Sequence, residues 1–206
     1  PSGCGKSSLV RAGLLPVMAH EPGWQTLPPM VPGVSPVAAL AGYLARGAGG
    51  LPLGWTASSV RDRLNQDDGL AVLCDDLLGA APGHGRAVLL VVDQFEELLT
   101  MAPAQARGHF ARLLRPALAG SAQVVGTVRP EFLGQLLASP ELSDLAADTF
   151  ALRPLRHDAL STVIEEPARV AGITVDPELV ARLVEDTDTG EALPLLAFTL
   201  AQLAED

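Results

Sequence analysis

The chain opens with glycine, lysine and serine residues whose spacing suits the binding of a polyphosphate. Gly3 and Gly5 allow backbone turns that a Cβ would oppose, and such turns point successive N–H groups inward as an anion nest. Lys6 then offers an ammonium group to the outer phosphates, and Ser7 offers a hydroxyl to Mg²⁺. The residues expected to contact the phosphates are Gly3, Cys4, Gly5, Lys6, Ser7 and Ser8. This segment matches the phosphate loop G-x-x-x-x-G-K-[ST] without its first glycine.

Lys6 is the only lysine, and arginine supplies the remaining cations among 14 Lys and Arg residues. Where arginine has replaced lysine elsewhere, a retained lysine indicates a place that needs the compact ammonium group. Apolar residues at helical spacing follow Ser7, so the phosphates would lie at a helix N-terminus, which favours anions. The alternative is a glycine-rich turn that precedes a helix by chance, and a second half of the site downstream would argue against it.

That second half follows residues 87–92, a continuous apolar run typical of a strand buried on both faces. Asp93 comes directly after this run, at the strand end where open α/β sheets bind ligands. We expect Asp93 to hold Mg²⁺ together with Ser7, and either Glu96 or Glu97 to orient or deprotonate an attacking water. The alternatives are a helix N-cap for Asp93 and ordinary first-turn helix charge for the two glutamates.

A second apolar run, residues 122–128, also predicts a buried strand, and Pro130 then opens a helix. Arg129 would therefore lie on the same rim of the sheet as Asp93. A cation at this place is suited to contacting the γ-phosphate, whereas the alternative role is a surface salt bridge.

The remaining pattern alternates strands and helices, which predicts an α/β fold with a mostly parallel sheet. The predicted strands are residues 24–27, 87–92, 122–128 and 149–152. Predicted helices run from the phosphate loop to about residue 19 and over residues 37–46, 57–65, 70–80, 104–118, 130–138 and 141–147. After residue 153 the pattern is helical only, over 158–171, 177–185 and 195–205.

Two domains are expected from this change of pattern: a P-loop nucleotide-binding core over residues 1–153, and a small helical subdomain, itself incomplete, over 154–206. We expect the core to be truncated at its N-terminus. The residue before Pro1 would be glycine, and an apolar strand that leads into the phosphate loop would precede it.

Composition narrows the class of protein. Among 206 residues, 48% are hydrophobic and 18% are charged, as in a globular domain rather than a disordered tail. The net charge of −10 gives no basic surface, which argues against direct contact with nucleic acid. No apolar run is long enough to cross a bilayer, so no membrane contact is expected. Cys4 and Cys74 are too few for a disulfide framework and lack metal-ligand spacing, which favours a reducing, cytoplasmic setting.

Segments 1–16, 90–98 and 127–132 together resemble the novel STAND NTPases of type 1, bacterial relatives of the NACHT and AP-ATPase signalling NTPases. The resemblance implies a three-layer P-loop NTPase sandwich with strand order 5-1-4-3-2, followed by a helical bundle. It implies that Lys6 and Ser7 form the Walker A pair, that Asp93 is the Walker B acid and that Arg129 is the sensor arginine. Pro194 matches a proline that lies near the adenine in relatives, or it is simply a helix-start proline.

The same resemblance implies a signalling switch that binds ATP or ADP with Mg²⁺, hydrolyses ATP slowly and self-associates in its ATP form. Sensing and output would come from other domains of the same chain, such as WD-repeat propellers, helix-turn-helix domains or protease domains. Three alternatives stay open: an AAA-type remodelling ATPase, a small-molecule kinase, and a nucleotide-binding module without significant hydrolysis. The acidic composition gives no support to the AAA-type alternative, and no arginine-rich lid motif supports the kinase.

Overall fold

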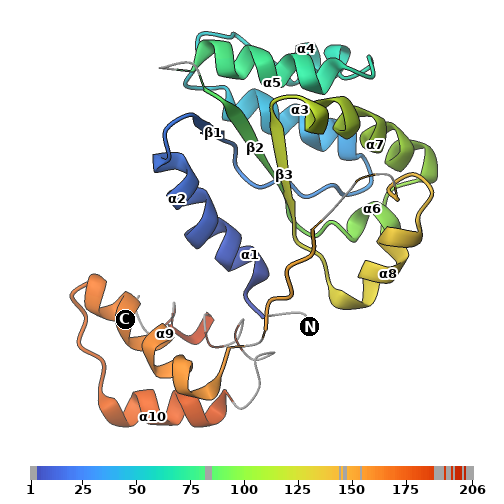
Figure 1. Ribbon diagram of the computed structural model, residues 1–206. Coiled ribbons are helices and arrows are strands. Elements are labelled where there is room, and N and C mark those ends of the chain that lie inside the picture. The colour runs from blue at the N-terminus through green and yellow to red at the C-terminus, as the bar shows by residue number, and fades with distance from the viewer. Residues whose placement is uncertain are drawn as a thin grey trace. The chain divides into compact units, whose positions relative to one another are not determined.

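The computed structural model describes residues 4–81, 85–143, 145, 148–153, 155–187, 193, 196, 198–200 and 202. These residues form parallel strands that alternate with helices, which confirms the predicted α/β class and the P-loop NTPase-like sandwich (Figure 1). The chain divides into two compact units. We call residues Ser7–Asp148 the sheet unit, and the described residues before Ser7 and from Thr149 onward the terminal unit.

Three parallel strands make the open sheet of the sheet unit, in the order β1-β2-β3. They are β1 (Trp24–Thr26), β2 (Ala87–Val92) and β3 (Ala122–Gly126). The middle strand is almost entirely buried, as its unbroken apolar run predicts. β3 pairs with β2 as far as Val92, and Met30 forms an isolated bridge to Val92 on the other side, so the carboxyl end of β2 is held on two sides and Asp93 leaves the strand from a fixed place.

Side chains of β2 alternate between two separate apolar cores. Val88, Leu90 and Val92 belong to the larger core, which is shared with the helices on one face of the sheet. Leu89 and Val91 belong to a smaller core with Val10, on the opposite face. The helices on the larger side are α3 (Pro36–Gly47), α4 (Ala57–Arg63), α5 (Gly69–Ala80) and α7 (Ala104–Ala119). Helices on both faces make this a three-layer arrangement (Figure 1).

The helix predicted after the phosphate loop is present over residues 6–20, in three parts. It consists of α1 (Lys6–Ser8), a π-helical turn η1 (Leu9–Leu14) and α2 (Leu15–His20). Single π turns inside helices often occur at functional sites. The predicted helices at 37–46, 57–65, 70–80, 104–118 and 130–138 are likewise present, and a short α6 (Glu97–Thr100) was not predicted.

Two predicted elements are wrong. Residues 149–152 form no strand, because none of the described strands pairs with them, and Phe150 lies 85% exposed instead of packing on a sheet face. The helix predicted over 141–147 is absent where the structure describes it, at residues 141–143 and 145. There, turn hydrogen bonds and Arg115, which donates to the carbonyl oxygen of Glu141 at 3.3 Å, replace the helical pattern.

The terminal unit contains α9 (His157–Val170) and α10 (Pro177–Asp186), which agree with the helices predicted at 158–171 and 177–185. The two helices share a small core that includes Leu160, Ile164 and Val180. The predicted helix at 195–205 falls mostly outside the described residues. Among the helices that the structure describes, none is both long and apolar enough to span a bilayer.

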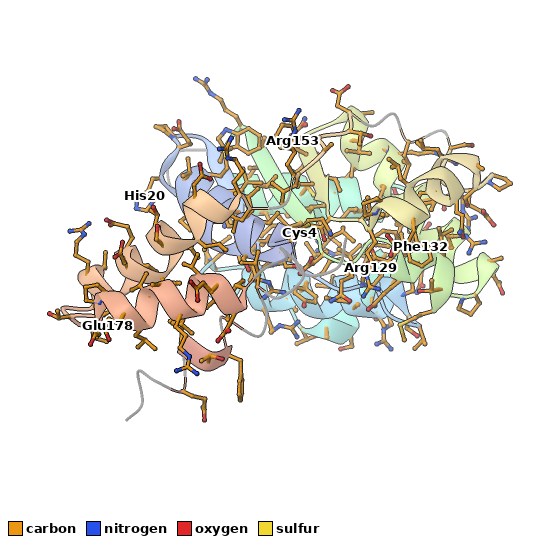
Figure 2. The ribbon with its side chains drawn as sticks, turned by 90° about the horizontal axis from the view of Figure 1, so that it is seen from below. Cys4, His20, Arg129, Phe132, Arg153 and Glu178 are labelled. Carbon is orange, nitrogen blue, oxygen red and sulfur yellow. The ribbon has the colours of Figure 1, made fainter. Side chains whose placement is uncertain are left out.

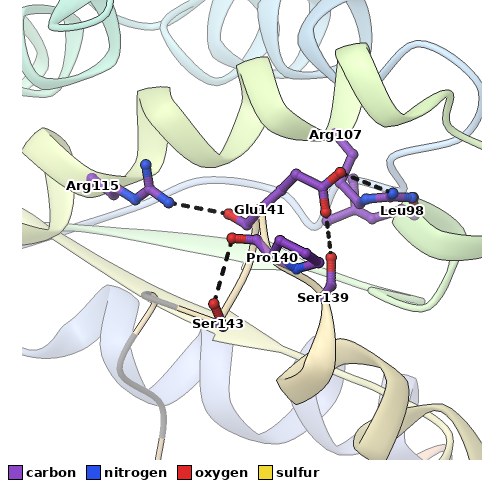
Figure 3. A network of polar contacts seen from close by, with 7 residues as sticks. All are labelled: Leu98, Arg107, Arg115, Ser139, Pro140, Glu141 and Ser143. Atoms are coloured by element: carbon purple, nitrogen blue, oxygen red, sulfur yellow. Dashed lines mark hydrogen bonds and ion pairs between the residues drawn. The ribbon is translucent and has the colours of Figure 1, made fainter.

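A polar network fixes the segment after α8 (Pro130–Ala138) to α7 (Figure 3). Arg107 on α7 donates to Glu141 Oε1 at 3.1 Å, and the Ser139 hydroxyl donates to Glu141 Oε2 at 2.7 Å. Arg107 also donates to the carbonyl oxygen of Leu98 at 3.2 Å. The chain that leaves α8 is therefore tied to α7, at the end of α8 away from Arg129.

Replacing Glu141 with glutamine should lower the stability of the chain at neutral pH, because Arg107 loses a charged acceptor. Hydrogen bonds from Arg107 and Ser139 lower the pKa of Glu141 from 4.5 to about 2. The contribution of the carboxylate is thus complete above pH 4.5 and is lost as the pH falls toward about 2. Urea midpoints measured from neutral pH downward should show the gap between wild type and E141Q closing below pH 4.5.

Glu165→Gln serves as the control for this titration, because Glu165 is exposed in the middle of α9 and belongs to no part of the network. E165Q should follow the wild-type midpoints at every pH. A gap between wild type and E141Q that stays constant across the titration would contradict an ionic contribution from Glu141.

Candidate functional site

Asp93 is the centre of a polar cluster at the carboxyl end of the sheet. Its side chain is 4% exposed. The hydroxyl groups of Ser7 and Thr127 both donate to its Oδ1, at 2.7 Å and 2.6 Å. Ser7 lies in the first turn of the helix on one face of the sheet, whereas Thr127 follows β3, so three separate segments meet at one carboxylate. The structure therefore brings together Ser7 and Asp93, which the sequence predicted as a metal-binding pair.

Arg11 completes this cluster, and it was not among the predicted site residues. Its Nη2 donates to Asp93 Oδ2 at 3.3 Å, while the arginine side chain is 52% exposed. Burial alone would raise the pKa of Asp93, but hydrogen bonds from Thr127, Ser7 and Arg11, with the charge of Arg11, lower it below its ordinary value. The carboxylate is thus ionised at neutral pH although it is buried, as a metal ligand must be.

The chain turns sharply after Asp93. Gln94 adopts a φ of 56°, a left-handed conformation that is uncommon for a residue other than glycine. Thr127 stabilises this turn, since its hydroxyl accepts from the Gln94 N–H at 3.0 Å and its carbonyl oxygen accepts from the Phe95 N–H at 2.7 Å. A Cβ at Gly126 would lie 3.1 Å from the Phe95 ring, so the glycine permits the turn to close over β3.

Glu96 and Arg129 form an ion pair at the same rim. Arg129 Nε lies 3.2 Å from Glu96 Oε1, and the glutamate side chain is 8% exposed against 43% for the arginine. Glu96 Oε2 is buried and has no hydrogen-bond partner among the described residues. Arg129 is the residue before α8, and its carbonyl oxygen accepts from the Phe132 N–H at 3.0 Å, which closes the first turn (both are labelled in Figure 2).

Glu97 has a different environment from Glu96. Its Oε2 accepts from the Gly33 N–H at 3.0 Å, across 64 positions of the sequence. Gly33 has a φ of 57° in the Pro-rich loop that follows β1. Glu97 therefore holds this loop, and of the two predicted glutamates it is Glu96 that has a buried carboxylate oxygen left unpaired.

The described part of the phosphate loop comprises Cys4, Gly5 and Lys6, since Gly3 lies outside the described residues. Gly5 has a φ of 84°, the left-handed conformation for which its glycine was predicted. Lys6 Nζ lies 3.4 Å from the Cys4 sulfur, and Cys4 is buried. Ser8 continues α1 and is exposed, and Pro194 lies outside the described residues.

The oxygen atoms at this rim suit a hard divalent cation. Ser7 and Asp93 present a hydroxyl and a carboxylate held 2.7 Å apart. No group of three or more His, Cys, Asp or Glu side chains among the described residues can hold a metal by itself. Mg²⁺ typically takes one or two protein ligands, keeps several waters and shares phosphate oxygens. The oxygen atoms of Ser7 and Asp93 therefore fit Mg²⁺ that is bound jointly with a phosphate ligand.

Comparison with known proteins identifies the family. The Novel STAND NTPase 1 family matches residues 1–206. The chain belongs to this family. Neither the curated proteins nor the solved structures gave a match. Membership of the Novel STAND NTPase 1 family makes the chain a nucleotide-binding P-loop NTPase module, in agreement with the family that the sequence motifs resemble.

Thr127, Arg11 and Gly33 are the site residues of this STAND NTPase module that the sequence interpretation missed. A signal existed for the first two. Thr127 is a polar residue near the end of the apolar run over residues 122–128, and Arg11 lies four positions after Ser7, about one helical turn. The contact of Gly33 with Glu97 had no such signal, because it depends on how a Pro-rich loop folds back.

Replacing Thr127 with valine should destabilise the chain by about 1–3 kcal/mol, because Asp93 and the Gln94 N–H each lose a hydrogen bond in a buried place. Valine has nearly the same shape, so little packing is lost. Thr127→Ser keeps the hydroxyl and should retain most of the stability. Urea unfolding of the three proteins measures the difference. A loss of stability for T127S with none for T127V would show that the methyl group, and not the hydroxyl, is what matters.

Proposed function

We propose that this STAND NTPase module binds ATP and ADP with Mg²⁺ and acts as a slowly hydrolysing signalling switch. The observation that carries the proposal is the 2.7 Å contact between the Ser7 hydroxyl and the Asp93 carboxylate, which are 86 positions apart in the sequence. A hydroxyl after the phosphate-loop lysine and an acid at the end of a central strand are the two protein ligands that P-loop NTPases offer to Mg²⁺.

The phosphates would bind to the backbone around Gly5 and to Lys6, with the start of the helix behind them. The left-handed conformation of Gly5 supports this assignment, because it is the conformation that a phosphate nest requires. Mg²⁺, when bound, would neutralise charge that develops on the phosphates. Ser7 and Asp93 would hold it, and Asp93 is prepared for this because its pKa is lowered despite burial.

Hydrolysis would depend on Glu96 and Arg129. Glu96 Oε2, which is buried and lacks a hydrogen-bond partner among the described residues, would accept a hydrogen bond from a water. Glu96 would thus orient the attacking water, while Arg129 would contact the γ-phosphate and report its presence. Glu97 would act indirectly, by holding the loop at Gly33.

The switch would couple this site to the rest of the protein. We propose a nucleotide-binding core over residues 1–153 and a helical subdomain over 154–206, which the separate small core of α9 and α10 supports. Residues 192–194 would contribute Pro194 near the base. In the cytoplasm of a bacterium, the module would act with other domains of a longer chain, such as WD-repeat, helix-turn-helix or protease domains, and would self-associate in its ATP form.

Nucleotide binding is tested by calorimetric titration of the chain with ATP and with ADP in the presence of Mg²⁺. Lys6→Ala should weaken both affinities by about tenfold or more, because it removes the ammonium group that faces the outer phosphates. Lys6→Arg should also weaken them, since a guanidinium does not replace the compact ammonium. Arg61→Ala, an exposed change on α4, is the control for loss of one positive charge. A wild-type chain without affinity for either nucleotide would refute the proposal.

The two glutamates should behave differently in a single-turnover assay of ATP hydrolysis. Glu96→Gln should slow hydrolysis by about 10²-fold or more, with little change in nucleotide affinity, because the water loses its strong acceptor. Glu97→Gln should remain close to wild type, since an amide oxygen still accepts from the Gly33 N–H. The reverse pattern would assign the water to Glu97. No turnover by the wild-type chain would favour a nucleotide-binding module without significant hydrolysis.

A further inference from the structure

Arg11 occupies the side of Asp93 that the two hydroxyl groups leave free. Ser7 and Thr127 both donate to Oδ1. Oδ2 accepts from Arg11 Nη2 at 3.3 Å. The buried carboxylate therefore carries neutral donors on one oxygen and a cation on the other.

The arginine is held by its place on the helix that carries Ser7. Ser7 and Arg11 are four positions apart, and the π-helical turn η1 begins between them, at Leu9. The backbone of this turn is anchored, because Val10 is buried in the core with Leu89 and Val91. The side chain of Arg11 itself is 52% exposed, whereas that of Asp93 is 4% exposed. In this pair the acid is fixed, and the arginine is the partner that has room to move.

We propose that Arg11 is a built-in competitor of Mg²⁺ at Asp93. The proposal rests on the proposed nucleotide site. Without metal, the guanidinium neutralises a carboxylate that would otherwise be buried as an uncompensated charge. When the metal nucleotide binds, Arg11 leaves Oδ2 and its charge turns toward solvent or the phosphates. The chain thereby stays stable without ligand. It also needs a higher Mg²⁺ concentration to bind nucleotide than it would need if Arg11 did not contact Asp93.

A positioning role for Arg11 predicts the opposite result. If the arginine only kept Asp93 oriented and ionised for the metal, its removal would weaken metal binding. The sign of the change in Mg²⁺ requirement therefore separates competition from positioning.

The experiment measures how much Mg²⁺ is needed to bind ADP, so that no turnover is involved. The chain is titrated with Mg²⁺ at a fixed ADP concentration, and binding is followed by calorimetry or by thermal stabilisation. Arg11→Gln should lower the half-maximal Mg²⁺ concentration by about twofold to fivefold, the range expected for removal of a partly exposed ion pair. Arg11→Lys keeps the charge and should lie near wild type. Arg61→Gln removes a distant exposed arginine and should leave the requirement unchanged.

The melting temperature gives a second readout on the same proteins. Without metal and nucleotide, R11Q should melt below wild type, and saturating Mg²⁺ with ADP should remove most of this difference. An unchanged or higher Mg²⁺ requirement for R11Q would overturn the competition, even if nucleotide binds normally. Wild type that binds no nucleotide would instead refute the proposed function, and this proposal with it.

Discussion

The site depends on keeping one carboxylate ionised inside the protein. Asp93 is buried, and burial by itself favours its protonated form. Ser7, Thr127 and Arg11 reverse this preference by donating to its two oxygens. Ser7 and Arg11 come from the helix after the phosphate loop and Thr127 from the end of β3, so the ionised carboxylate and the meeting of these segments require each other. A buried charge that lost its partner would cost about 3–5 kcal/mol, a large part of the roughly 5–15 kcal/mol by which domains are stable.

The central strand of the sheet determines where the buried Asp93 carboxylate lies. Because β2 is buried on both faces and paired on both sides, its last residue cannot move without disturbing two apolar cores. The neighbouring strand β3 ends at Gly126, two residues before its predicted end. Thr127 then leaves the strand pattern and uses its hydroxyl and carbonyl groups to close the turn at Gln94 and Phe95. Ending β3 early is therefore part of how the site forms.

The sequence correctly predicted the features that depend only on residues close together in the chain. The β2 run, the Gly5 turn and the acid at the strand end follow from side-chain types and spacing, and the structure has each of them. Elements that depend on a distant partner were predicted poorly. Residues 149–152 have strand-like composition, but no described strand pairs with them. Similarly, the loop at Gly33 joins Glu97 through a backbone N–H, a donor that every residue except proline carries and that no sequence pattern marks.

The two ion pairs at the carboxyl end of the sheet differ in the same way in how exposed their partners are. This difference suggests how the module can change state. In each pair the acid is buried and the arginine is about half exposed: 4% against 52% for Asp93 and Arg11, and 8% against 43% for Glu96 and Arg129. The acids are held by the strand and the turn after it, whereas both arginines reach in from the surface. If a polyphosphate binds at this rim as proposed, it would offer the arginines a second set of anionic partners, whereas the buried acids would stay in place. Charge would then be redistributed by side-chain movements at the surface, without repacking of the buried core. Exchanges of this kind differ by only a few kcal/mol between states, which is the range in which a bound ligand can shift a two-state equilibrium.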